Sequence, residues 1–508
     1  MKKYFIQTFW CAMNLADSEK INMLLTQSGF LKVTSPETAD LIILNTCSVR
    51  KKWEDRVFGI IKDIIKARSV KETVIASDSE AIQKKWNNIV NGLLHTSQWQ
   101  SNLPIIWITW CMVRKTGLNE KYLKEKKERE RARKIELLED ENGILNNDDK
   151  LFPRLKELDF TLRIEEIKYL QLILSHIFKE KIWQEDKFDD YLKMKQLRDN
   201  PALASVIIQT WCDNYCTYCI VPYTRWREFS RSKDDIILDC KEAVKNWAKE
   251  ITLIGQNVNS YWKQFIDNKY WNEEKSKWNW SIWKSPFREL LDEINKIDWL
   301  DRIRFTSSNP HDMTRDILDA HFELDKMCNY LHFALQSGND EILKKMNRKH
   351  TYNDFKNQVQ YLRSKDPLFA ISTDIIVWFS SETDEMFQDT LKAFEELEFD
   401  FAYIARYSVR PWTIASKIYP DDVPDSVKAE RWHKLNNALM KSLTKRNKLM
   451  IGREEELLIY WEKDWHFFGR TRNFKEVFVE KQSDFNIWDL VKVKITKLDR
   501  WVLKWEII

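Results

Sequence analysis

The sequence is poor in glycine, which makes up 9 of its 508 residues. A soluble protein usually has about 7% glycine. Glycine adopts positive φ angles at the least cost, so a chain of this length with so little glycine must place other residues at its tight turns. Tryptophan, in contrast, is abundant, with 24 residues. The shortage therefore predicts that identifiable turns carry a residue that does not suit them.

The sequence also lacks a long apolar run and a strong net charge. Its longest apolar stretch, residues 105–113, is far shorter than the ~20 residues that span a bilayer. The first six residues resemble the start of a signal peptide, but neither an adequate apolar segment nor a cleavage site follows them. Lys and Arg total 82 against 78 Asp and Glu, so no overall basic field attracts a polyanion. We therefore expect a cytoplasmic protein, neither secreted nor bound to a membrane.

Residues 1–117 alternate between strand and helix patterns. Strand patterns cover residues 4–9, 41–44 and 105–108, and helical patterns cover residues 17–28 and 55–68. This alternation predicts a parallel sheet. Cys11, Cys47 and Cys111 each follow one of the three strands, at the end where open α/β sheets build their sites. From the residues alone, these cysteines are either ligands of one metal centre or buried thiols.

A charged stretch follows the third strand. Sixteen of the 22 residues from 120 to 141 carry a charge, with both signs interspersed. We interpret it as a solvent-exposed helix with i,i+4 ion pairs, the alternative being an RNA-binding arm. Residues 158–178 complete the first domain, which is expected over residues 1–180 with a charged insertion at 119–150. Residues 181–200 form a charged linker that ends at Pro201.

Six strand patterns follow in the middle of the chain, each before a helical or loop segment. They cover residues 204–210, 251–254, 302–306, 331–335, 371–377 and 401–407. Six successive βα units predict a partial (β/α)6 barrel over residues 201–445, with its working loops at the carboxyl ends of the strands.

From about residue 446 the pattern changes to short strands. They cover residues 455–460, 475–480, 490–495 and 502–507, and they predict a small OB-like β-barrel over residues 446–508. Between Arg470 and Lys504, nine Lys and Arg stand against five Asp and Glu. A small basic barrel is either a nucleic-acid-binding module or a structural appendage. The expected fold class is thus α/β, with a flavodoxin-like parallel-sheet domain, a partial barrel and a small C-terminal β-barrel.

Three cysteines follow the first barrel strand in the pattern Cys212-x3-Cys216-x2-Cys219. Three thiolates at this spacing hold three irons of a [4Fe–4S] cluster and leave the fourth iron open. A zinc site requires a fourth protein ligand, and no further Cys or His stands nearby to supply it. An open iron is what a radical S-adenosylmethionine (SAM) enzyme needs, because the amino and carboxylate groups of SAM bind there. Cys240 and Cys328 match no motif and are expected to be core thiols.

At these residues the sequence resembles the radical SAM tRNA methylthiotransferases, and the resemblance covers nearly the whole chain, including a C-terminal TRAM domain. The stretch Pro222-Tyr223-Thr224-Arg225 resembles the branch that acts on isopentenylated adenosine. The matching motifs are Asp213-Asn214-Tyr215, Ile220-Val221-Pro222-Tyr223-Thr224-Arg225, Arg227-Glu228-Phe229-Ser230-Arg231, Leu253-Ile254-Gly255-Gln256-Asn257-Val258-Asn259-Ser260-Tyr261, Leu335-Gln336-Ser337-Gly338, Tyr407-Ser408-Val409-Arg410-Pro411 and Phe468-Gly469-Arg470-Thr471. One departure is Ala12, where the family usually has Gln.

The resemblance implies a radical SAM enzyme with two [4Fe–4S] clusters. Cys212, Cys216 and Cys219 would hold the cluster that cleaves SAM, and Cys11, Cys47 and Cys111 an auxiliary cluster. The implied reaction uses two SAM molecules to add a methylthio group to C2 of N6-isopentenyladenosine at tRNA position 37, next to the anticodon. The anticodon loop is unpaired, so its bases can enter a pocket. The candidate SAM contacts are Gly255, Gln256, Asn257, Gln336 and Ser337.

Other readings of the function stay open at this point. The modified base could be threonylcarbamoyl-adenosine, or the chain could be a non-catalytic iron–sulfur protein that binds RNA. As an enzyme, the chain would need an electron donor such as flavodoxin or ferredoxin, and we expect it to work as a monomer.

The family motifs also show where glycine is missing. Eight tryptophans stand where the family has glycine, namely Trp10, Trp110, Trp211, Trp226, Trp378, Trp412, Trp488 and Trp505, the last two at turns of the TRAM domain. Three explanations are base-stacking platforms, a degenerate protein, and UGA codons that encode glycine but were translated as tryptophan. The third predicts UGA at these sites and UGG at genuine tryptophans such as Trp432. One further departure, Ser380-Ser381, replaces a Pro-Gly pair of the family.

Overall fold

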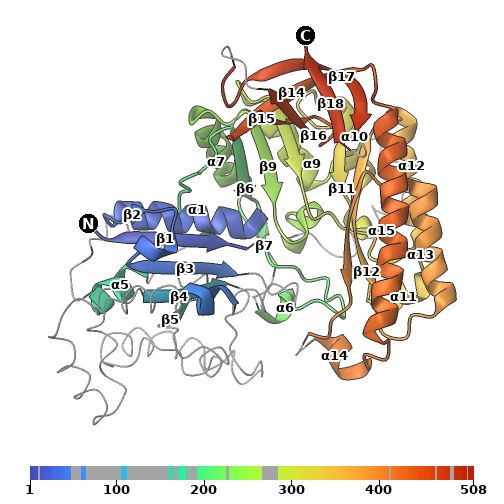
Figure 1. Ribbon diagram of the computed structural model, residues 1–508, viewed down its shortest axis with the longest axis horizontal. Coiled ribbons are helices and arrows are strands. Elements are labelled where there is room, and N and C mark those ends of the chain that lie inside the picture. The colour runs from blue at the N-terminus through green and yellow to red at the C-terminus, as the bar shows by residue number, and fades with distance from the viewer. Residues whose placement is uncertain are drawn as a thin grey trace, which may run out of the picture. The chain divides into compact units, whose positions relative to one another are not determined.

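The computed structural model of the chain forms two compact units, Met1–Leu197 and Arg198–Ile508, and each is described by itself (Figure 1). The structure describes residues 1–9, 12–46, 59–64, 105–110, 160–162, 164, 167, 170–178, 182, 191–224, 228–265, 284–410, 413–463, 466–480, 485–499 and 502–508. The expected helix at 120–141 lies outside these residues, as does most of the one expected at 55–68, of which 59–64 are helical. Across the described residues, the structure has no helix with both the length and the apolar character to cross a membrane.

The first unit is built on a five-stranded parallel sheet. Its strand order, β2-β1-β3-β4-β5, is that of flavodoxin-like folds, which confirms the expected parallel sheet. The middle strand β3 is buried along its whole length, which explains its continuous apolar run. The elements are β1 (Lys3–Thr8), α1 (Ala12–Gln27), β2 (Leu31–Lys32), η1 (Pro36–Thr38), β3 (Leu41–Thr46), β4 (Ile105–Trp110), β5 (Phe160–Leu162), α5 (Leu170–Phe178) and η4 (Tyr191–Lys193).

Helix α1 begins five residues earlier than the sequence pattern predicts. Its first two turns bury polar side chains, among them Asn14 and Ser18, which do not register as an apolar stripe. These side chains instead form hydrogen bonds with residues at the ends of the neighbouring strands. The helix ends before Gly29, whose φ of +79° is the conformation that glycine adopts most easily.

The second unit begins with six parallel strands that follow one another in chain order. They form two three-stranded sheets, β6-β9-β10 and β11-β12-β13, joined by parallel bridges between Ile303 and Met327 and between Ser308 and Phe333. This arrangement confirms the partial (β/α)6 barrel. The strands are β6 (Leu203–Ile207), β9 (Glu250–Ile254), β10 (Arg302–Phe305), β11 (Tyr330–His332), β12 (Ala370–Val377) and β13 (Phe401–Arg406).

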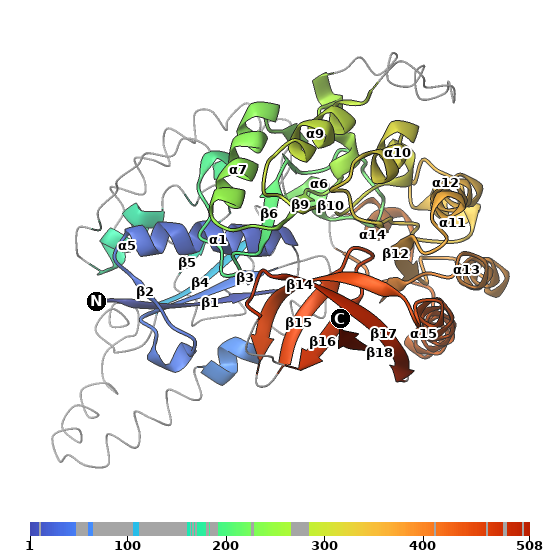
Figure 2. The same ribbon diagram turned by 90° about the horizontal axis from the view of Figure 1, so that it is seen from above.

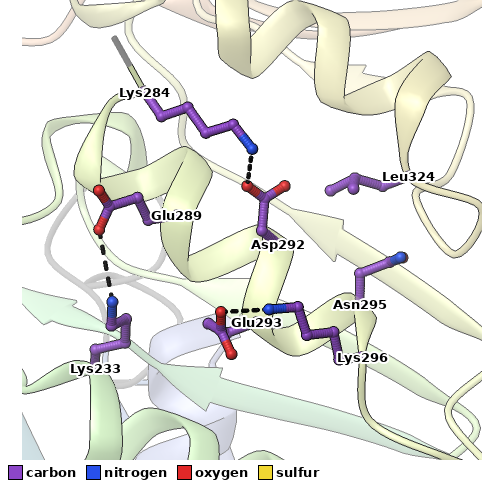
Figure 3. Close-up of a pocket in the computed structure, with 8 residues that line it drawn as sticks. All are labelled: Lys233, Lys284, Glu289, Asp292, Glu293, Asn295, Lys296 and Leu324. Carbon is purple, nitrogen blue, oxygen red and sulfur yellow. Dashed lines mark hydrogen bonds and ion pairs between the residues drawn. The ribbon is translucent and has the colours of Figure 1, made fainter. Parts of the chain in front are cut away.

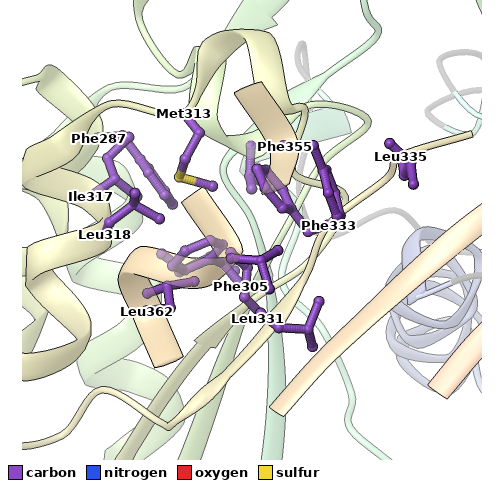
Figure 4. Packing of buried hydrophobic residues seen from close by; sticks show 14 of the residues in the cluster. Phe287, Phe305, Met313, Ile317, Leu318, Leu331, Phe333, Leu335, Phe355 and Leu362 are labelled. Atoms are coloured by element: carbon purple, nitrogen blue, oxygen red, sulfur yellow. The ribbon is translucent and has the colours of Figure 1, made fainter. Parts of the chain in front are cut away.

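Helices pack on the outside of these strands (Figure 1). Ser232, Ser285 and Thr351 cap three of the helices by accepting backbone N–H bonds, as expected of residues at helix starts. The core between helices and strands is rich in phenylalanine, and within it the rings of Phe333 and Phe355 stack on each other (Figure 4). The helices are α6 (Val221–Thr224), α7 (Lys233–Lys245), η5 (Val258–Ser260), η6 (Lys263–Phe265), α9 (Pro286–Asn295), η7 (Pro310–Asp312), α10 (Arg315–Glu323), α11 (Asp340–Lys345), α12 (Tyr352–Lys365), α13 (Asp384–Leu397), α14 (Ile414–Ile418) and α15 (Asp425–Lys448).

Two barrel strands are shorter than expected. The pattern at 204–210 divides into β6 and β7 (Gln209–Thr210), because the chain leaves the barrel after Ile207 and pairs antiparallel with β8 (Phe229–Ser230). This hairpin returns Glu228 to the loop that follows β7. The pattern at 331–335 ends as strand β11 at His332, and the chain continues to Gln336 through isolated bridges.

The last part of the chain forms a five-stranded antiparallel sheet, and Figure 2 shows its curvature. The strands lie in the order β16-β15-β14-β17-β18, and β16 also contacts β18, as in a small barrel. Strand β15 was not predicted from the sequence. Its Gly469 lies so close to Leu457 that a Cβ atom would be 2.4 Å from the Leu457 Cγ. The strands are β14 (Glu454–Lys463), β15 (His466–Thr471), β16 (Glu476–Glu480), β17 (Leu490–Asp499) and β18 (Val502–Ile507).

Buried charges attach this C-terminal barrel to the partial (β/α)6 barrel. Arg304 on β10 forms an ion pair with Glu250 on β9, at 3.0 Å between Nε and Oε2, and both side chains are 1% exposed. Arg304 also donates to the carbonyl oxygens of Thr471 and Arg472, at 2.7 and 2.8 Å. Arg302 donates to the Arg470 carbonyl at 2.6 Å. The barrel is therefore anchored at β9 and β10 as well as through the chain.

The eight tryptophans at glycine positions do not share one backbone conformation among the described residues. Trp211, Trp378 and Trp488 have φ angles of +68°, +63° and +81°, which confirms that their backbone favours glycine. Trp505 was expected at a turn, and this is wrong: it lies inside β18 and pairs with Ile495. Trp110 is the last residue of β4, and Trp10, Trp226 and Trp412 lie outside the described residues.

Candidate metal centre

The cysteines Cys212, Cys216 and Cys219 lie on one loop between β7 and α6, at the carboxyl end of the first barrel strand. Cys216 is buried, Cys212 and Cys219 are partly buried, and none of the three forms a disulfide. The loop turns tightly, since the Cys219 N–H donates to the Cys216 carbonyl oxygen at 2.9 Å. Tyr215 reaches the left-handed region, with φ of +49°. The structure thus brings the three predicted ligands together on one short segment.

The segment after the fourth barrel strand holds this loop in place. Thr217 donates its N–H to the Met346 carbonyl at 3.0 Å and its hydroxyl to the Lys345 carbonyl at 2.8 Å. The Asn347 amide donates to the carbonyl oxygens of Asn214 and Tyr215, at 3.3 and 3.0 Å. Because both carbonyls belong to the cysteine loop, the C-terminal end of α11 fixes the loop conformation.

Arg348, the next residue, contacts the sulfur of Cys216. Its Nη1 lies 3.7 Å from Sγ, and its Nη2 donates to the Ala334 carbonyl at 2.7 Å. Burial alone would lower the pKa of Arg348, but the neighbouring Cys216 and Tyr218 outweigh burial and raise it. Arg348 is therefore a permanent positive charge beside the candidate iron ligands.

The thiol of Cys212 lies in an unfavourable place for a free thiolate. Burial raises its pKa well above the usual value, and Cys216 and Glu228 raise it further. Iron ligands must be deprotonated, so the three thiols need a compensating positive group. Arg348 supplies one charge, and the irons of a cluster would supply the rest.

A polar network supports the other side of the loop. Glu228 accepts the Asp213 N–H at 3.2 Å and the Ser260 hydroxyl at 2.8 Å. Burial raises the pKa of Glu228 to about 7. Gln256, which follows β9, accepts the Trp211 N–H at 2.6 Å, so one candidate SAM contact touches the residue before Cys212.

The remaining candidate SAM contacts are buried and have partners within the protein. Asn257 donates to Asp312 at 2.8 Å, and the Ser337 hydroxyl accepts the Asn339 N–H at 3.2 Å. Gln336 has φ of +73° and pairs with Ile375. A Cβ atom on Gly255 would lie 3.2 Å from the Gln209 carbonyl, so this glycine allows β9 to approach β7. Their contact with SAM remains a prediction.

The donor set fits a [4Fe–4S] cluster better than a single ion. Nowhere in the described part of the chain are three His, Cys, Asp or Glu side chains placed to hold one metal ion. In a cluster held by three cysteines, each thiolate binds a different iron, so the sulfurs need not converge on one point. The absence of a disulfide at the three thiols, the cation beside Cys216 and the lack of a further Cys or His on the loop agree with this.

The second set of cysteines, Cys11, Cys47 and Cys111, lies outside the described residues. The strands that precede them, β1, β3 and β4, are parallel neighbours in the sheet. The order of the strands changes direction at β1 and β3, where folds of this kind bind their ligands.

A buried amide pair lies at the same ends of β1 and β3. Asn14 donates to the Phe9 carbonyl at 2.9 Å, and Asn45 donates to the Asn14 carbonyl at 2.7 Å. Both side-chain oxygens are buried without a hydrogen-bond partner among the described residues. This end of the sheet therefore has polar groups to offer to a further component.

Sequence reasoning did not find Arg348 or Asn347. Both lie in Met346-Asn347-Arg348, a stretch without a chemical pattern of its own. Their role depends on the end of α11 reaching the cysteine loop, and the residues that meet in these contacts are 132 or 133 positions apart in the chain. Only a prediction of the barrel geometry could have indicated them.

A hollow of about 450 Å³ on α7 and α9 is not part of this centre (Figure 3). Its charges pair with one another: Lys284 with Asp292 at 2.6 Å, Lys233 with Glu289 at 3.5 Å, and Lys296 with Glu293 at 2.7 Å. No charge in the pictured set is left to select a ligand.

Comparison with known proteins agrees with this geometry. Residues 206–394 match the Radical SAM superfamily, and residues 3–79 match Uncharacterized protein family UPF0004. A tRNA-2-methylthio-N(6)-dimethylallyladenosine synthase from Clostridium novyi is 35% identical over 100% of this chain and 97% of its own length. One from Caldicellulosiruptor saccharolyticus is 33% identical over 100% and 93%.

Among solved structures, the radical S-adenosylmethionine methyltransferase TsrM from Kitasatospora setae is 10% identical, with a TM-score of 0.43 over 82% of this chain and 75% of that one. This likeness is too low to support a conclusion. The two synthases match over nearly their full lengths, so the chain belongs to the family of the tRNA-2-methylthio-N(6)-dimethylallyladenosine synthases.

Proposed function

We propose that this protein adds a methylthio group to C2 of an N6-isopentenylated adenosine at tRNA position 37. The observation that carries the proposal is the loop with Cys212, Cys216 and Cys219 at the carboxyl end of a barrel strand, in a chain whose relatives bear this name. SAM and [4Fe–4S] clusters are the cofactors. The C2–H bond of an adenine ring is too strong for acid–base chemistry, so the reaction needs a radical.

Cys212, Cys216 and Cys219 would hold the cluster that receives SAM. When bound there, this group supplies the electron that cleaves the sulfonium of SAM and produces the radical. Arg348 offsets the charge of the thiolates, and the network of Glu228 and Gln256 holds the loop that carries Cys212.

Aromatic residues pack together beside the buried part of the loop. The ring of Tyr218 meets that of Phe379 edge to face, at 6.5 Å between centroids, and Phe379 packs in the same way against Tyr407. Burial raises the pKa of Tyr218 well above its usual value, so the phenol stays neutral. The neutral phenol and the ring of Phe379 form an apolar wall on this side of the loop, and an apolar wall protects a reactive intermediate from side reactions.

Cys11, Cys47 and Cys111 would hold an auxiliary cluster at the ends of β1, β3 and β4. The C-terminal barrel would bind tRNA, since it is small and basic, while the anticodon loop places its base in the partial barrel. The proposal implies a cytoplasmic monomer that receives electrons from flavodoxin or ferredoxin.

The test is nucleoside mass spectrometry on isopentenylated tRNA after anaerobic incubation with SAM and reductant. The chain is reconstituted with iron and sulfide and carries glycine at its motif tryptophans. We expect a methylthio-adenosine product that is lost in Cys212→Ala and in Cys11→Ala. Cys240→Ala is the matched control, because Cys240 is fully buried in the core away from the loop and should keep product formation.

Failure has two informative forms. No product with both clusters assembled would refute the proposed substrate, and product on threonylcarbamoylated tRNA would assign the other base. Product formation that survives Cys212→Ala would refute the role of the loop.

A further inference from the structure

Tryptophan is concentrated at left-handed backbone positions in this chain. Among the described residues, thirteen non-glycine residues have a positive φ, and six of them are tryptophan. Tryptophan is 24 of 508 residues, so composition alone would place fewer than one there. A positive φ is a genuine outlier for a bulky residue, because the Cβ atom collides with the following carbonyl. The six are Trp211, Trp247, Trp262, Trp299, Trp378 and Trp488.

Three of them, Trp247, Trp262 and Trp299, match none of the family motifs noted in the sequence. Trp247 shows the reason for its conformation most clearly. Its N–H donates to the Val244 carbonyl, and the Ala248 N–H donates to the Ala243 carbonyl, both at 3.0 Å. These two bonds form the Schellman motif that ends helix α7, and Trp247 occupies the position at which such motifs use glycine.

Trp488 and Trp299 also lie in turns. The Asp489 N–H donates to the Asn486 carbonyl at 3.2 Å, so Trp488 is the third residue of a β-turn and has φ of +81°. A turn with positive φ at this position is the type that requires glycine. Trp299 follows Asp298 in the turn between α9 and β10, with φ of +64°.

The indole rings give a second, independent observation. The Nε1 atoms of Trp211 and Trp378 are buried without a partner among the described residues. In contrast, Trp247 and Trp299 leave a large apolar ring in solvent, since they are 69% and 82% exposed. Trp432 behaves as a tryptophan should: it lies in α15, packs on the barrel core and donates to the Ile404 carbonyl at 3.0 Å.

We propose that these six positions are glycine in the protein that the gene encodes, through UGA codons that its own host reads as glycine. The proposal adds Trp247, Trp262 and Trp299 to the motif positions. Trp247 and Trp299 are supported by φ and by exposure, whereas Trp262 is supported by φ alone, because its ring packs against Tyr261 and Phe265. The composition supports it: a glycine content of about 7% would need about 27 more glycines, close to the 24 tryptophans.

The proposal also removes a competing site. A hollow of about 570 Å³ lies between Trp247 and Trp299, with Lys241, Lys245 and Lys249 on its rim. Indoles next to lysines have the chemistry of a nucleobase clamp. However, the two indoles that line it are side chains that their backbone least tolerates. With glycine at both positions, the hollow has no aromatic ring on which a base could stack, and we do not assign it as a nucleobase site.

The experiment compares the full chain with the double variant W247G/W299G and with W432G as the control. We expect the double variant to raise Tm by about 2–4 °C, since it relieves two strained residues and loses little packing. W432G should lower Tm. A lower Tm in the double variant, or weaker tRNA binding by it, would overturn the proposal and support a clamp. Peptide mass spectrometry on protein from its own host should show glycine at 247 and 299, and tryptophan there would refute it.

A different observation carries a second inference, which rests on the proposed function. We propose that Arg348 is a positioning residue that sets the reduction potential of the cluster at Cys216. Its guanidinium is partly buried, lies 3.7 Å from the Cys216 sulfur and is held by the Ala334 carbonyl. A cation fixed beside the cluster favours the reduced cluster, which carries one more negative charge.

Redox titration of the reconstituted chain tests this without the reaction. In R348Q we expect the ratio of reduced to oxidised cluster at a fixed potential to fall at least tenfold, a shift of about 59 mV. R348K keeps the charge and should restore most of it, and K349Q, at the exposed next residue, should change nothing. An unchanged potential in R348Q, or an equal shift in R348K, would refute the role of charge.

If R348Q fails to assemble a cluster while R348K assembles one at the original potential, the charge requirement stands. If both fail, the contact is structural and the proposal is wrong. A chain that shows these potentials but makes no methylthio product would refute the proposed function and leave this inference intact.

Discussion

Replacing Glu250 with glutamine tests how the C-terminal barrel is attached. Glu250 is 1% exposed and lies among Arg302, Arg304 and Arg470. Burial alone would raise its pKa, but the three guanidinium groups outweigh burial and lower it. The carboxylate is therefore charged and compensates cations that are themselves buried.

The expected loss follows from what E250Q leaves behind. Glutamine keeps the shape, but Arg304, at 1% exposure, then has only the neutral carbonyl oxygens of Thr471 and Arg472 as hydrogen-bond acceptors, whereas Arg302 keeps its ion pair with Glu456. Removing one partner of a buried ion pair costs about 3–5 kcal/mol, because the other charge stays buried and uncompensated. Pairs at the surface contribute only about 0–1 kcal/mol.

The assay is denaturant unfolding of the full chain, with limited proteolysis of the segment between α15 and β14. We expect E250Q to lower the free energy of unfolding by about 3–5 kcal/mol and to make residues 449–453 easier to cut. E430Q is the matched control, because Glu430 pairs with Lys434 on the exposed face of α15. A loss below about 1 kcal/mol, equal to that of the control, would refute the anchoring role of the buried charges.

Three further predictions each concern a substitution at one residue. Burial raises the pKa of Glu382 to about 7, so the folded state holds a proton that the unfolded state releases near pH 4.5. The free energy of unfolding should therefore fall by up to about 3 kcal/mol between pH 4.5 and pH 7, and the unfolding curves of E382Q should lack this pH dependence. Burial alone would raise the pKa of Asp400, but Lys475 and two arginines outweigh burial and lower it. The stability that this carboxylate contributes should be lost as the pH falls below the ordinary pKa of aspartate, so D400N should be less stable at pH 7 and should lose less stability in acid. A Cβ atom on Gly338 would lie 2.6 Å from the Thr390 Cα, so Gly338→Ala should cost at least about 1–3 kcal/mol in thermal unfolding; an unchanged Tm would show that α13 moves freely.

The order of the strands could be predicted because it follows from the sequence of βα units. Parallel strands with short connections leave few topologies, and both the sheet of the first unit and the six barrel strands agree with the expectation. Strand β15 was missed because Gly469 interrupts its pattern, and glycine is depleted in strands. That strand exists because Gly469 accommodates Leu457 from β14, a contact that the local sequence does not encode.

The site divides in the same way. Cysteines on one loop are visible as a spacing, so Cys212, Cys216 and Cys219 could be found from the sequence. Arg348 contacts Cys216 across the barrel, and its neighbours in the chain give no signal. The glycine positions show both cases: motifs revealed Trp211, and only the φ angle revealed Trp247, whereas the turn expected at Trp505 is a strand.

The buried contacts of Arg302 and Arg304 have a consequence for affinity. A short segment connects Lys448, where α15 ends, to Glu454, where β14 begins. The hydrogen bonds of the two arginines further restrict how the C-terminal barrel can move relative to the partial barrel. Two binding modules on a flexible tether lose effective concentration as the tether explores space. If the C-terminal barrel binds RNA as proposed, it does so at a fixed distance from the partial barrel, and an RNA that touches both loses its translational freedom once. Weak contacts on the C-terminal barrel would then be enough to select RNAs whose length matches that distance.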